Sequence, residues 1–477
     1  MGNSRRDFLA LLFCGLGTAL SPELLLTRPA WSAPRSDTGA INVVVTGGGK
    51  RLAVADPLVW TTGKTASVDS IVVDPGQKFQ SILGFGGALT DATCSTINGL
   101  PADKQNALLG RFFGSGQDSL SLNVCRTCVG ASDYSSRAYS FDDGDADPDL
   151  KRFSIDHDRA YILPVLKKAR AINPDLFLFS SPWSPPGWMK SNNSMLGGNM
   201  QRRYMPSYAE YFVKFLKGYE EAGVPIQAVT VQNEVDTDQD GKMPACAWPQ
   251  EYEADFVRHH LGPAFEKHGL KTKIWLIDHN YNLWGRAVGE LETPDVTKYA
   301  SGIAWHGYVG DPGKMELVHK AFPDIDMFWT EGGPDYTDKH YSDNWAWWGK
   351  SFSGTLNNWC RSITTWNLAL DEVGKPNIGP FSCGGMVTVN SKSGELSYSG
   401  QYYAVGHFSK YVKKGAMRLA SQSKIEGIDQ VAFQNPDGQL VLVVTNGGGE
   451  RTIKVQVADR FFDLKMAADS MATLYWS

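Results

Sequence analysis

Short apolar runs alternate with amphipathic stretches along the middle of the chain, from about Ile82 onward. The runs are rich in β-branched residues and stop at polar or aromatic residues, which is typical of buried strands. The expected strands are Ile82–Gly86, Leu120–Arg126, Leu176–Ser181, Ala228–Glu234, Lys273–Asp278, Gly302–His306, Asp326–Glu331 and Ser362–Asn367.

Between most of these strands, apolar residues recur at steps of three and four, the period of a helix packed on one side. Such helices are expected at Pro101–Phe113, Asp156–Ile172, Pro206–Gly223, Pro249–His268 and Gly313–Phe322. Eight strands alternating with helices predict an α/β fold, a (β/α)8 TIM barrel. A doubly wound sheet is the alternative, but no Gly-rich phosphate turn follows the first strand.

Both ends of the chain have a different pattern of apolar and polar residues from the middle. Residues 41–74 alternate apolar and polar positions between Gly and Pro turns, and the segment after residue 396 contains a hairpin pattern around Asn435–Gly438. We therefore expect an antiparallel β-domain built from N-terminal strands (33–80) and a C-terminal segment (396–477), beside a catalytic barrel at 81–395. The ends of a barrel lie near each other, which makes this arrangement economical.

The first 32 residues resemble a twin-arginine export signal, with Arg5-Arg6 before a short apolar run. That run is too short to span a bilayer, and we expect no transmembrane anchor. The protein is predicted to be periplasmic or secreted. Residues 1–32 carry a net charge of +1, so the remainder of the chain, at −6, is mildly acidic. Such a balance argues against nucleic acid or an anionic membrane as the partner.

Six cysteines follow the predicted signal, and Cys125 and Cys128 have the spacing of a redox or zinc pair. Side chains three apart on a strand face opposite ways, and no second pair completes a tetrahedral site. Because twin-arginine cargo is exported already folded, we expect free thiols.

The predicted strands end in polar, acidic or aromatic residues. In a (β/α)8 barrel, active sites are built at these carboxyl ends. The residues concerned are Asp91, Arg126, Trp183, Asn233, Glu234, His306, Tyr308, Glu331, Trp366 and Asn367, with Asp278-His279-Asn280 after the fifth strand.

Glu234 and Glu331 end the fourth and seventh strands, which face each other across a barrel mouth. A single glutamate at a strand end is most often a salt-bridged structural residue. Two carboxyl groups converging from opposite walls suit glycoside hydrolysis, in which one protonates the leaving oxygen and the other attacks the anomeric carbon.

Six motifs in one order resemble those of glycoside hydrolase family 30, the family of acid β-glucosidase (glucosylceramidase). They are Phe85–Asp91, Ser181–Pro185, Thr230–Val235, Trp329–Gly332, Thr365–Leu370 and Gly406–Lys410. The resemblance covers the chain from about Ile82 to the C-terminus. It implies a retaining β-glycosidase that needs no metal or other cofactor and acts on a β-glucoside, either a glycolipid or a glucan oligosaccharide.

The resemblance also implies roles for the residues at the strand ends. Glu234 would be the general acid/base and Glu331 the nucleophile, with their carboxyls about 5 Å apart. Asn233 would bind the sugar 2-hydroxyl, and Arg126 would pair with Glu331. The remaining expected contacts are Asp91 and Trp183 to the far hydroxyls, Trp366 and Asn367 in the sugar pocket, and Tyr308 at the nucleophile with His306 beside it.

The leaving group stays open. Gly307 stands where the mammalian enzyme has Trp, which removes a ring from the aglycone side. A glucosylceramidase-like or other β-glucosidase is the leading hypothesis, and an endo-β-1,6-glucanase is the alternative within the family. A xylosidase fits Asp91 and Trp183 less well. From another class, an inactive carbohydrate-binding protein is opposed by the retained glutamates, and a serine hydrolase by the lack of a G-x-S-x-G elbow.

Overall fold

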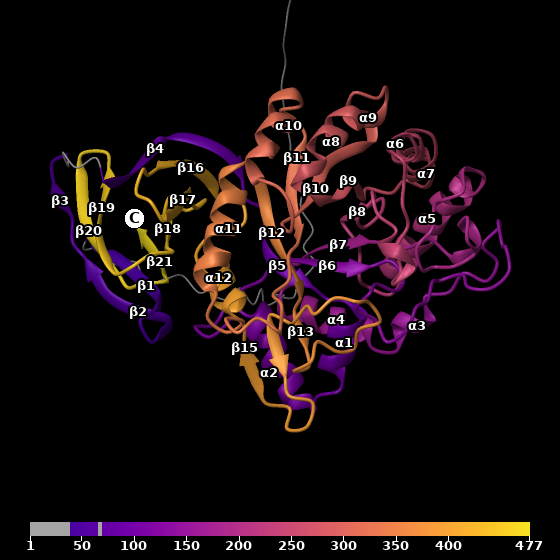
Figure 1. Cartoon of the computed structure of the whole chain (residues 1–477), viewed down its shortest axis with the longest axis horizontal. Helices are drawn as coiled ribbons and strands as arrows, with labels where there is room; N and C mark the ends of the chain where they lie inside the picture. Colours follow the sequence, from indigo (N-terminus) through magenta and orange to yellow (C-terminus); the bar gives the residue numbers. More distant parts are fainter. Residues whose placement is uncertain (1–38, 65–68) are drawn as a thin grey trace, which may run out of the picture. The chain divides into compact units, whose positions relative to one another are not determined.

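The computed structural model describes residues 39–64 and 69–477. The predicted export signal at 1–32 lies outside the described residues. The described chain contains a closed parallel barrel, an open ten-stranded sheet and a small sheet of β13 (Ala369–Leu370), β14 (Val387–Val389) and β15 (Leu396–Tyr398) (Figure 1).

Eight parallel strands close the barrel, which confirms the predicted fold. In order around it they are β5 (Gly84–Ala88), β6 (Val124–Cys128), β7 (Phe177–Ser181), β8 (Ala228–Thr230), β9 (Lys273–Asn280), β10 (Ala300–His306), β11 (Asp326–Glu331) and β12 (Cys360–Asn367). Seven of them start within two residues of the predicted start. The second strand begins four residues late because Ser121 takes a left-handed φ of 55°, which interrupts extended backbone.

Side chains pointing inward fill the barrel. Trp275 and Phe328 stack with their ring centroids 4.0 Å apart, and Phe179 packs against Trp275. β5 instead contributes glycines. A Cβ at Gly86 would lie 1.6 Å from the carbonyl oxygen of Val124, so only glycine lets these two strands approach each other here.

Helices surround the barrel. In α5 (Met205–Glu221), within the predicted helix 206–223, five aromatic residues at steps of three and four form one fully buried stripe: Tyr208, Tyr211, Phe212, Phe215 and Tyr219. The others of more than seven residues are α1 (Asp91–Asn98), α2 (Ala102–Phe113), α4 (Ile162–Ile172), α8 (Trp284–Leu291), α11 (Trp345–Asn357) and α12 (Gly400–Ser409). The pattern did not predict α11, whose start has no side-chain cap.

Ten strands from both chain ends form one sheet, which confirms the predicted β-domain (Figure 1). β1 (Ile41–Gly47) pairs antiparallel with β21 (Ser470–Trp476), and the predicted hairpin is β17 (Ile428–Gln434) with β18 (Leu440–Asn446). The other strands are β2 (Lys50–Leu58), β3 (Thr61–Thr62), β4 (Ser70–Ser81), β16 (Met417–Gln422), β19 (Arg451–Val457) and β20 (Arg460–Met466).

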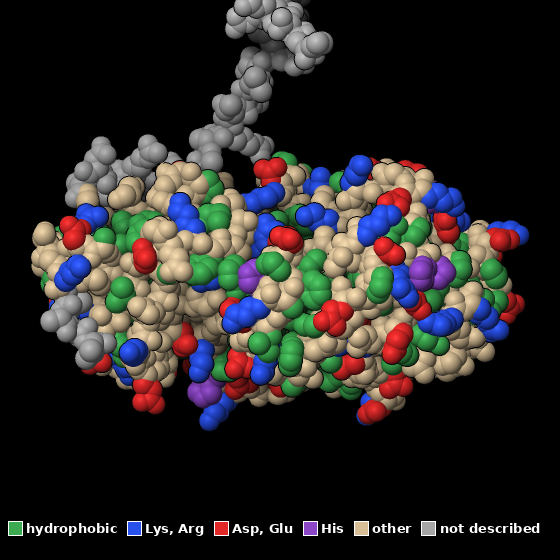
Figure 2. Space-filling view, turned by 90° about the horizontal axis from the view of Figure 1, so that it is seen from above, with side chains coloured by type: hydrophobic (Ala, Val, Ile, Leu, Met, Phe, Trp, Pro, Cys, Tyr) green, Lys and Arg blue, Asp and Glu red, His purple; other side chains and the backbone are tan. Residues whose placement is uncertain are grey.

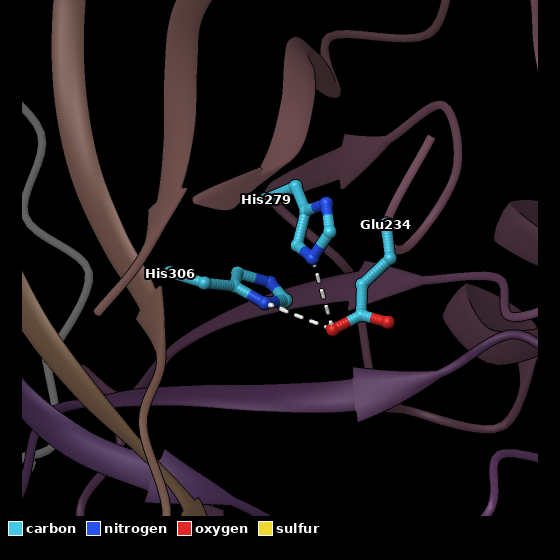
Figure 3. A group of neighbouring side chains, drawn as sticks. All are labelled: Glu234, His279 and His306. Carbon is cyan, nitrogen blue, oxygen red and sulfur yellow. Dashed lines mark ion pairs between the residues drawn. The ribbon is translucent and has the colours of Figure 1, made fainter. Parts of the chain in front are cut away.

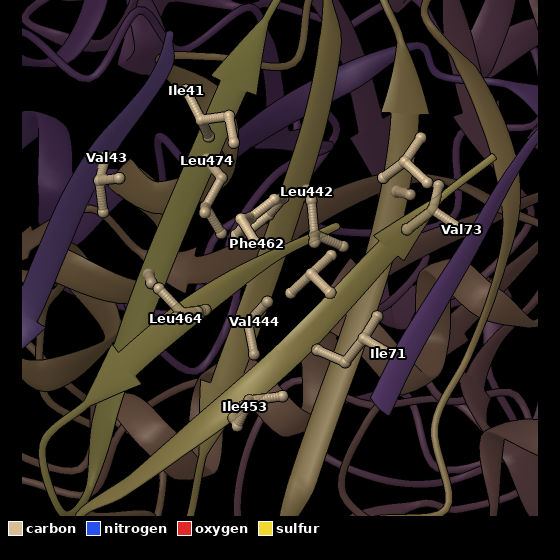
Figure 4. Packing of buried hydrophobic residues seen from close by; sticks show 14 of the residues in the cluster. Ile41, Val43, Ile71, Val73, Leu442, Val444, Ile453, Phe462, Leu464 and Leu474 are labelled. Atoms are coloured by element: carbon tan, nitrogen blue, oxygen red, sulfur yellow. The ribbon is translucent and has the colours of Figure 1, made fainter. Parts of the chain in front are cut away.

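The core of the β-domain is almost entirely aliphatic (Figure 4). Ile41, Ile71, Leu442, Val444 and Leu474 are each at most 2% exposed. Burying such side chains contributes about 1.5–3 kcal/mol each relative to leaving them in water. The core itself holds no group able to act on a substrate.

α12 joins the barrel to the β-domain through His407, which is fully buried. Its Nδ1 and Nε2 each lie 2.8 Å from a threonine hydroxyl, of Thr473 and Thr46 respectively. The Thr473 hydroxyl donates to the carbonyl of His407, so the ring Nδ1–H donates to Thr473. Burial lowers the pKa of the ring, which favours its neutral form. We call this contact the seam.

Acidic and basic side chains are interspersed over the face shown in Figure 2. Within the described ranges, no helix is both long and apolar enough to cross a membrane. The six cysteines after the predicted signal are all free thiols, as expected.

Candidate active site

A cavity of about 340 Å³ opens at the carboxyl ends of the barrel strands. It is lined by six of the predicted site residues: Trp183, Asn233, Glu234, Tyr308, Glu331 and Trp366. The sequence therefore predicted much of the wall of this cavity.

Glu331 is the last residue of β11, and both of its carboxylate oxygens are held. Arg126 Nη1 lies 2.5 Å from Oε2, and the Tyr308 hydroxyl donates to Oε1 at 3.0 Å. The guanidinium balances the negative charge, and the phenol fixes the orientation of the carboxylate. Glu331 is thus presented to the cavity as an oriented anion.

Arg126 is fully buried behind the cavity and contacts several of the site residues. Besides Glu331, its Nη2 donates to Asn233 Oδ1 at 2.8 Å and to Asp278 Oδ2 at 2.6 Å. Its guanidinium carbon also lies 4.6 Å from the ring centroid of Trp183. One cation therefore positions two cavity residues, Asn233 and Glu331, and is the shared ion-pair partner of two carboxylates.

Asp278 is the second buried charge of this network, and the sequence did not assign it a role. Burial alone would raise its pKa, but Arg126 and hydrogen bonds from its neighbours hold the pKa well below its usual range. Its oxygens accept from hydroxyls on three other strands or their ends, those of Ser181, Thr230 and Thr330.

Glu234 lies beyond its strand, which corrects the predicted extent of strand four. β8 ends at Thr230, and Glu234 takes a left-handed φ of 55°, an uncommon conformation for a residue with a side chain. Its amide donates to the carbonyl of Asp278 at 3.0 Å. Strained backbone of this kind clusters at functional sites.

The Glu234 carboxyl faces two histidines (Figure 3). His279 Nε2 lies 3.3 Å and His306 Nδ1 3.7 Å from the same oxygen, Oε1. The Gln239 amide donates to the other oxygen, Oε2. The His306 ring also reaches Glu331, since its Nε2 lies 3.8 Å from Oε2 of that residue.

Glu234 and His279 each change the protonation of the other. Burial would raise the pKa of Glu234, but the neighbouring imidazoles of His279 and His306 hold it below its usual range. Burial would lower the pKa of His279, but its bonds with Asp236 and Glu234 raise it to about 10. Glu234 and His279 thus hold one proton between them near neutral pH.

Trp183 and Trp366 form an aromatic wall. Their rings stack with centroids 5.0 Å apart, and both lie on the cavity surface. Aromatic faces are suited to the C–H faces of sugar rings.

Asp91 is not among the cavity residues. It is the first residue of α1 and has no exposed side-chain surface. Its Oδ1 accepts from the amide of Ser136 at 2.9 Å, and its Oδ2 is 2.7 Å from both His157 Nε2 and the Tyr161 hydroxyl. The predicted contact of Asp91 with sugar hydroxyls does not fit this geometry, because its oxygens are committed to the protein.

Asp133 lines the cavity instead. It is 4% exposed, and its Oδ1 has no hydrogen-bond partner in the described part of the chain. Burial, and then the negative charges of Glu331 and Glu234, raise its pKa well above the usual range. Sequence reasoning missed it because it lies in the loop after strand two rather than at a strand end.

Asn367 and His306 lie behind the cavity wall. Both are fully buried, and neither lines the cavity. The Asn367 side chain accepts from the Thr90 hydroxyl at 2.6 Å, which ties β12 to the start of α1. His306 touches both glutamates, as described above.

Gly307 has a packing reason in this protein. A Cβ at this position would lie 2.6 Å from the buried ring of Trp329. The space next to Gly307 is therefore taken by an interior ring, and a side chain at 307 would require that ring to move.

Two carboxylic acids on one cavity at the mouth of a (β/α)8 barrel, beside a tryptophan wall, define a glycoside hydrolase. The family follows from the sequence as a whole. The chain belongs to glycosyl hydrolase family 30: residues 82–412 match its TIM-barrel domain and residues 415–474 its β-sandwich domain. It is a β-glycosidase. The boundary between these two matches follows α12, which packs on α11.

Relatives of two kinds are found. An endo-1,6-beta-D-glucanase of Neurospora crassa is 32% identical over 79% of this chain and 80% of its own length. The lysosomal acid glucosylceramidase of Mus musculus is 30% identical over 80% of this chain and 78% of its own length. Among solved structures, SrfJ from Salmonella typhimurium superposes with a TM-score of 0.87 at 26% identity, covering 92% of this chain and 99% of that one.

Proposed function

We propose that this protein hydrolyses β-glucosides by double displacement, with Glu331 as nucleophile and Glu234 as general acid/base. The observation that carries the proposal is that both carboxyls line one cavity, where Arg126 and Tyr308 hold Glu331 and where Glu234 faces the His279 imidazole. The retaining mechanism requires the two carboxyls to lie about 5 Å apart, against roughly 6.5–9.5 Å in inverting enzymes.

In the first step, Glu331 attacks the anomeric carbon and the bond to the leaving oxygen breaks. The proton shared by Glu234 and His279 passes through the Glu234 carboxyl to that oxygen. Arg126 and Tyr308 hold Glu331 in position for attack. The result is a glucosyl ester on Glu331.

In the second step, the ester is neutral, so Arg126 keeps Asp278 as its counterion while Glu331 no longer carries charge. Glu234, now a carboxylate, takes a proton from water, and the oxygen of that water attacks the anomeric carbon. Glu331 leaves as a carboxylate, and the sugar is released with its original β configuration.

Asn233, Trp183, Trp366 and Asp133 are proposed to bind the sugar ring. The Asn233 amide nitrogen is available to a hydroxyl, because its Oδ1 accepts from Arg126. The unpartnered Oδ1 of Asp133 can accept from a sugar hydroxyl, as was expected of Asp91. A site with such a group discriminates strongly against a ligand that leaves it unpaired.

The test is hydrolysis of an aryl β-glucoside followed by proton NMR. Release of the β-anomer of glucose first is expected. Release of the α-anomer first would contradict the mechanism, and a complete lack of hydrolysis of every β-glucoside tried would contradict the function.

A second candidate, endo-β-1,6-glucanase, is favoured by a groove next to the nucleophile loop. It has a volume of about 760 Å³ and is lined by polar and aromatic side chains, among them Arg51, Asp335, His340 and Trp347. Trp347 is 57% exposed. These side chains suit the hydroxyls and ring faces of further glucose units better than the alkyl chains of a ceramide.

The two candidates are separated by their products. Glucosylceramide, gentio-oligosaccharides and laminarin-type oligosaccharides are incubated with the enzyme, and the products are identified by mass spectrometry and chromatography. Internal cleavage of long gentio-oligosaccharides would support the endoglucanase, whereas release of ceramide alone would support the glucosylceramidase.

We propose that residues 1–32 direct export by the twin-arginine route, on the basis of Arg5-Arg6 and the apolar run that follows. The R5K/R6K double variant is expected to stay in the cytoplasm in a fractionation assay. Arg28→Lys, a matched change outside the pair, should be exported normally. Equal export of both variants would contradict the proposal.

A further inference from the structure

Three potential metal ligands from three consecutive strand ends converge on one point (Figure 3). Glu234 follows β8, His279 lies near the end of β9, and His306 ends β10. One ligand atom from each residue lies within 4.8 Å of those from the other two. Glycoside hydrolysis by two carboxyls does not require two imidazoles on the acid.

Both histidines are held from behind by a carboxylate. His279 Nδ1 lies 2.5 Å from Asp236 Oδ1, and His306 Nε2 lies 3.1 Å from Asp278 Oδ1. Histidines that ligate metals are oriented in this way by a carboxylate on the second nitrogen, which also makes the first nitrogen a better ligand. His306 Nδ1 is buried and has no hydrogen-bond partner in the part of the chain that the structure describes.

The spacing matches a small tetrahedral ion. Ligand atoms bound to zinc at about 2.0–2.2 Å lie about 3.3 Å from one another in a tetrahedron. His279 Nε2 and Glu234 Oε1 are 3.3 Å apart, and His306 Nδ1 and Glu234 Oε1 are 3.7 Å apart. Two of the three ligand pairs are thus within a few tenths of an ångström of tetrahedral spacing, and the two imidazole nitrogens lie within 4.8 Å of each other.

We propose that this cluster is a binding site for a divalent transition metal of the zinc type, and that metal bound there inhibits the enzyme reversibly. Two imidazoles and one carboxylate favour Zn²⁺, Co²⁺, Ni²⁺ or Cu²⁺ over Mg²⁺ and Ca²⁺, which prefer oxygen ligands. Glu234 and His279 line the cavity, so the fourth ligand is water or a substrate hydroxyl.

The inhibitory part rests on the proposed function, because an ion that uses the Glu234 oxygen prevents it from passing a proton to the leaving group. Metal binding itself does not depend on turnover. The Glu331→Gln variant, which has no nucleophile, should bind the metal like the native protein, so failure of the site and failure of the proposed mechanism give different results.

The experiment uses full-length protein freed of metal with EDTA and titrated with Co²⁺, whose visible absorption is intense only in tetrahedral sites. We expect one Co²⁺ per chain with tetrahedral bands, displacement of the bands by one equivalent of Zn²⁺, and loss of aryl β-glucosidase activity in proportion to occupancy. EDTA should restore the activity, and Mg²⁺ at the same concentration should have no effect.

Variants separate this cluster from adventitious binding. His279→Gln should abolish the tetrahedral bands, and Asp236→Asn should weaken Co²⁺ binding by about 10- to 100-fold, as for other carboxylates that hold a ligating histidine. His340→Gln is the matched control, since His340 is exposed and also lies beside an aspartate, Asp343. Absence of tetrahedral bands in the native protein, or equal Co²⁺ affinity in the native and His279→Gln proteins, would overturn the proposal.

Discussion

The barrel mouth and the seam each contain a fully buried histidine, but in opposite surroundings. His306 at the mouth lies among Asp278, Glu234 and Glu331, and although burial opposes it, these charges raise its pKa. His407 at the seam lies between two threonine hydroxyls, and burial lowers its pKa to about 3. Burial alone disfavours charge, so the neighbours of each ring decide its protonation.

The barrel mouth and the seam therefore differ in the kind of group that each one buries. At the mouth, the Arg126 guanidinium is buried between the carboxylates of Asp278 and Glu331 and forms an ion pair with both. The seam and the β-domain core hold aliphatic and neutral polar groups. Substitutions at the mouth should therefore change turnover, or leave a charge without its partner, whereas substitutions at the seam should act on stability alone.

The largest effect is expected from Glu331→Gln at the mouth. The amide cannot form the glucosyl ester, so kcat/KM on an aryl β-glucoside should fall by more than about 10⁴-fold. Initial rates measure the loss, and an unchanged circular dichroism spectrum shows that the fold is kept. Residual activity within about tenfold of the native enzyme would exclude Glu331 as nucleophile.

Arg126→Met should reduce stability as well as activity. Removal of the guanidinium leaves the buried carboxylates of Asp278 and Glu331 without a counterion, which typically costs about 3–5 kcal/mol. Urea denaturation monitored by tryptophan fluorescence gives the free energy of unfolding. A matched change outside the mouth, Arg203→Met, should alter it by less than about 0.5 kcal/mol. Equal stability of the two variants would contradict the charge balance described here.

Glu234→Gln should affect substrates according to their leaving groups. Loss of a general acid costs about 10²–10⁴-fold, so poor leaving groups should suffer this loss in the first step. Good leaving groups need no proton, and their glucosyl-enzyme should accumulate until azide attacks it. Product analysis should then find β-glucosyl azide. An equal loss on all leaving groups, without rescue by azide, would argue against the acid/base role.

The seam should make the protein sensitive to acid. The pKa of His407 is about 6.5 when unfolded and about 3 when folded, so below pH 6.5 the unfolded chain binds a proton that the folded chain does not. The neutral ring contributes its full share of the free energy of unfolding above about pH 6.5. That share decreases as the pH falls and is about 3 kcal/mol smaller at about pH 4.5. Unfolding free energies at both pH values measure it.

His407→Gln tests the source of that slope. The glutamine has no proton to gain in this range, so its pH dependence should be about 3 kcal/mol smaller than that of the native protein, whatever its overall stability. His340→Gln, at an exposed histidine, should keep the native slope. Identical slopes in all three proteins would show that His407 is not the group responsible.

The smallest effect is expected from Asp133→Ala. Loss of one sugar contact should weaken transition-state binding by about 1–3 kcal/mol, which lowers kcat/KM for a β-glucoside roughly 5- to 150-fold. Asp91→Ala, by contrast, should act on stability, since that carboxylate bonds only protein groups. Steady-state kinetics and thermal unfolding of both variants separate these roles, and a larger kinetic effect from Asp91 would reverse the assignment.

The sequence predicted the barrel because each strand is a local apolar run that ends at a polar residue. It also predicted that Glu234 and Glu331 would meet at one cavity, since strand ends in a barrel share one mouth. The role of Asp278 could not be read in this way, because hydroxyls from distant strands create it. Asp133 was missed and Asp91 chosen because position near a strand end does not fix where a side chain points.

The most direct test of the account is to trap the intermediate with an activated, fluorinated β-glucoside and analyse peptides by mass spectrometry. Fluorine slows both steps, and a reactive leaving group restores only the first, so the glucosyl-enzyme accumulates. The account predicts one sugar per chain on the peptide that contains Glu331. A sugar attached to any other carboxylate, or rapid turnover that leaves no adduct, would contradict it.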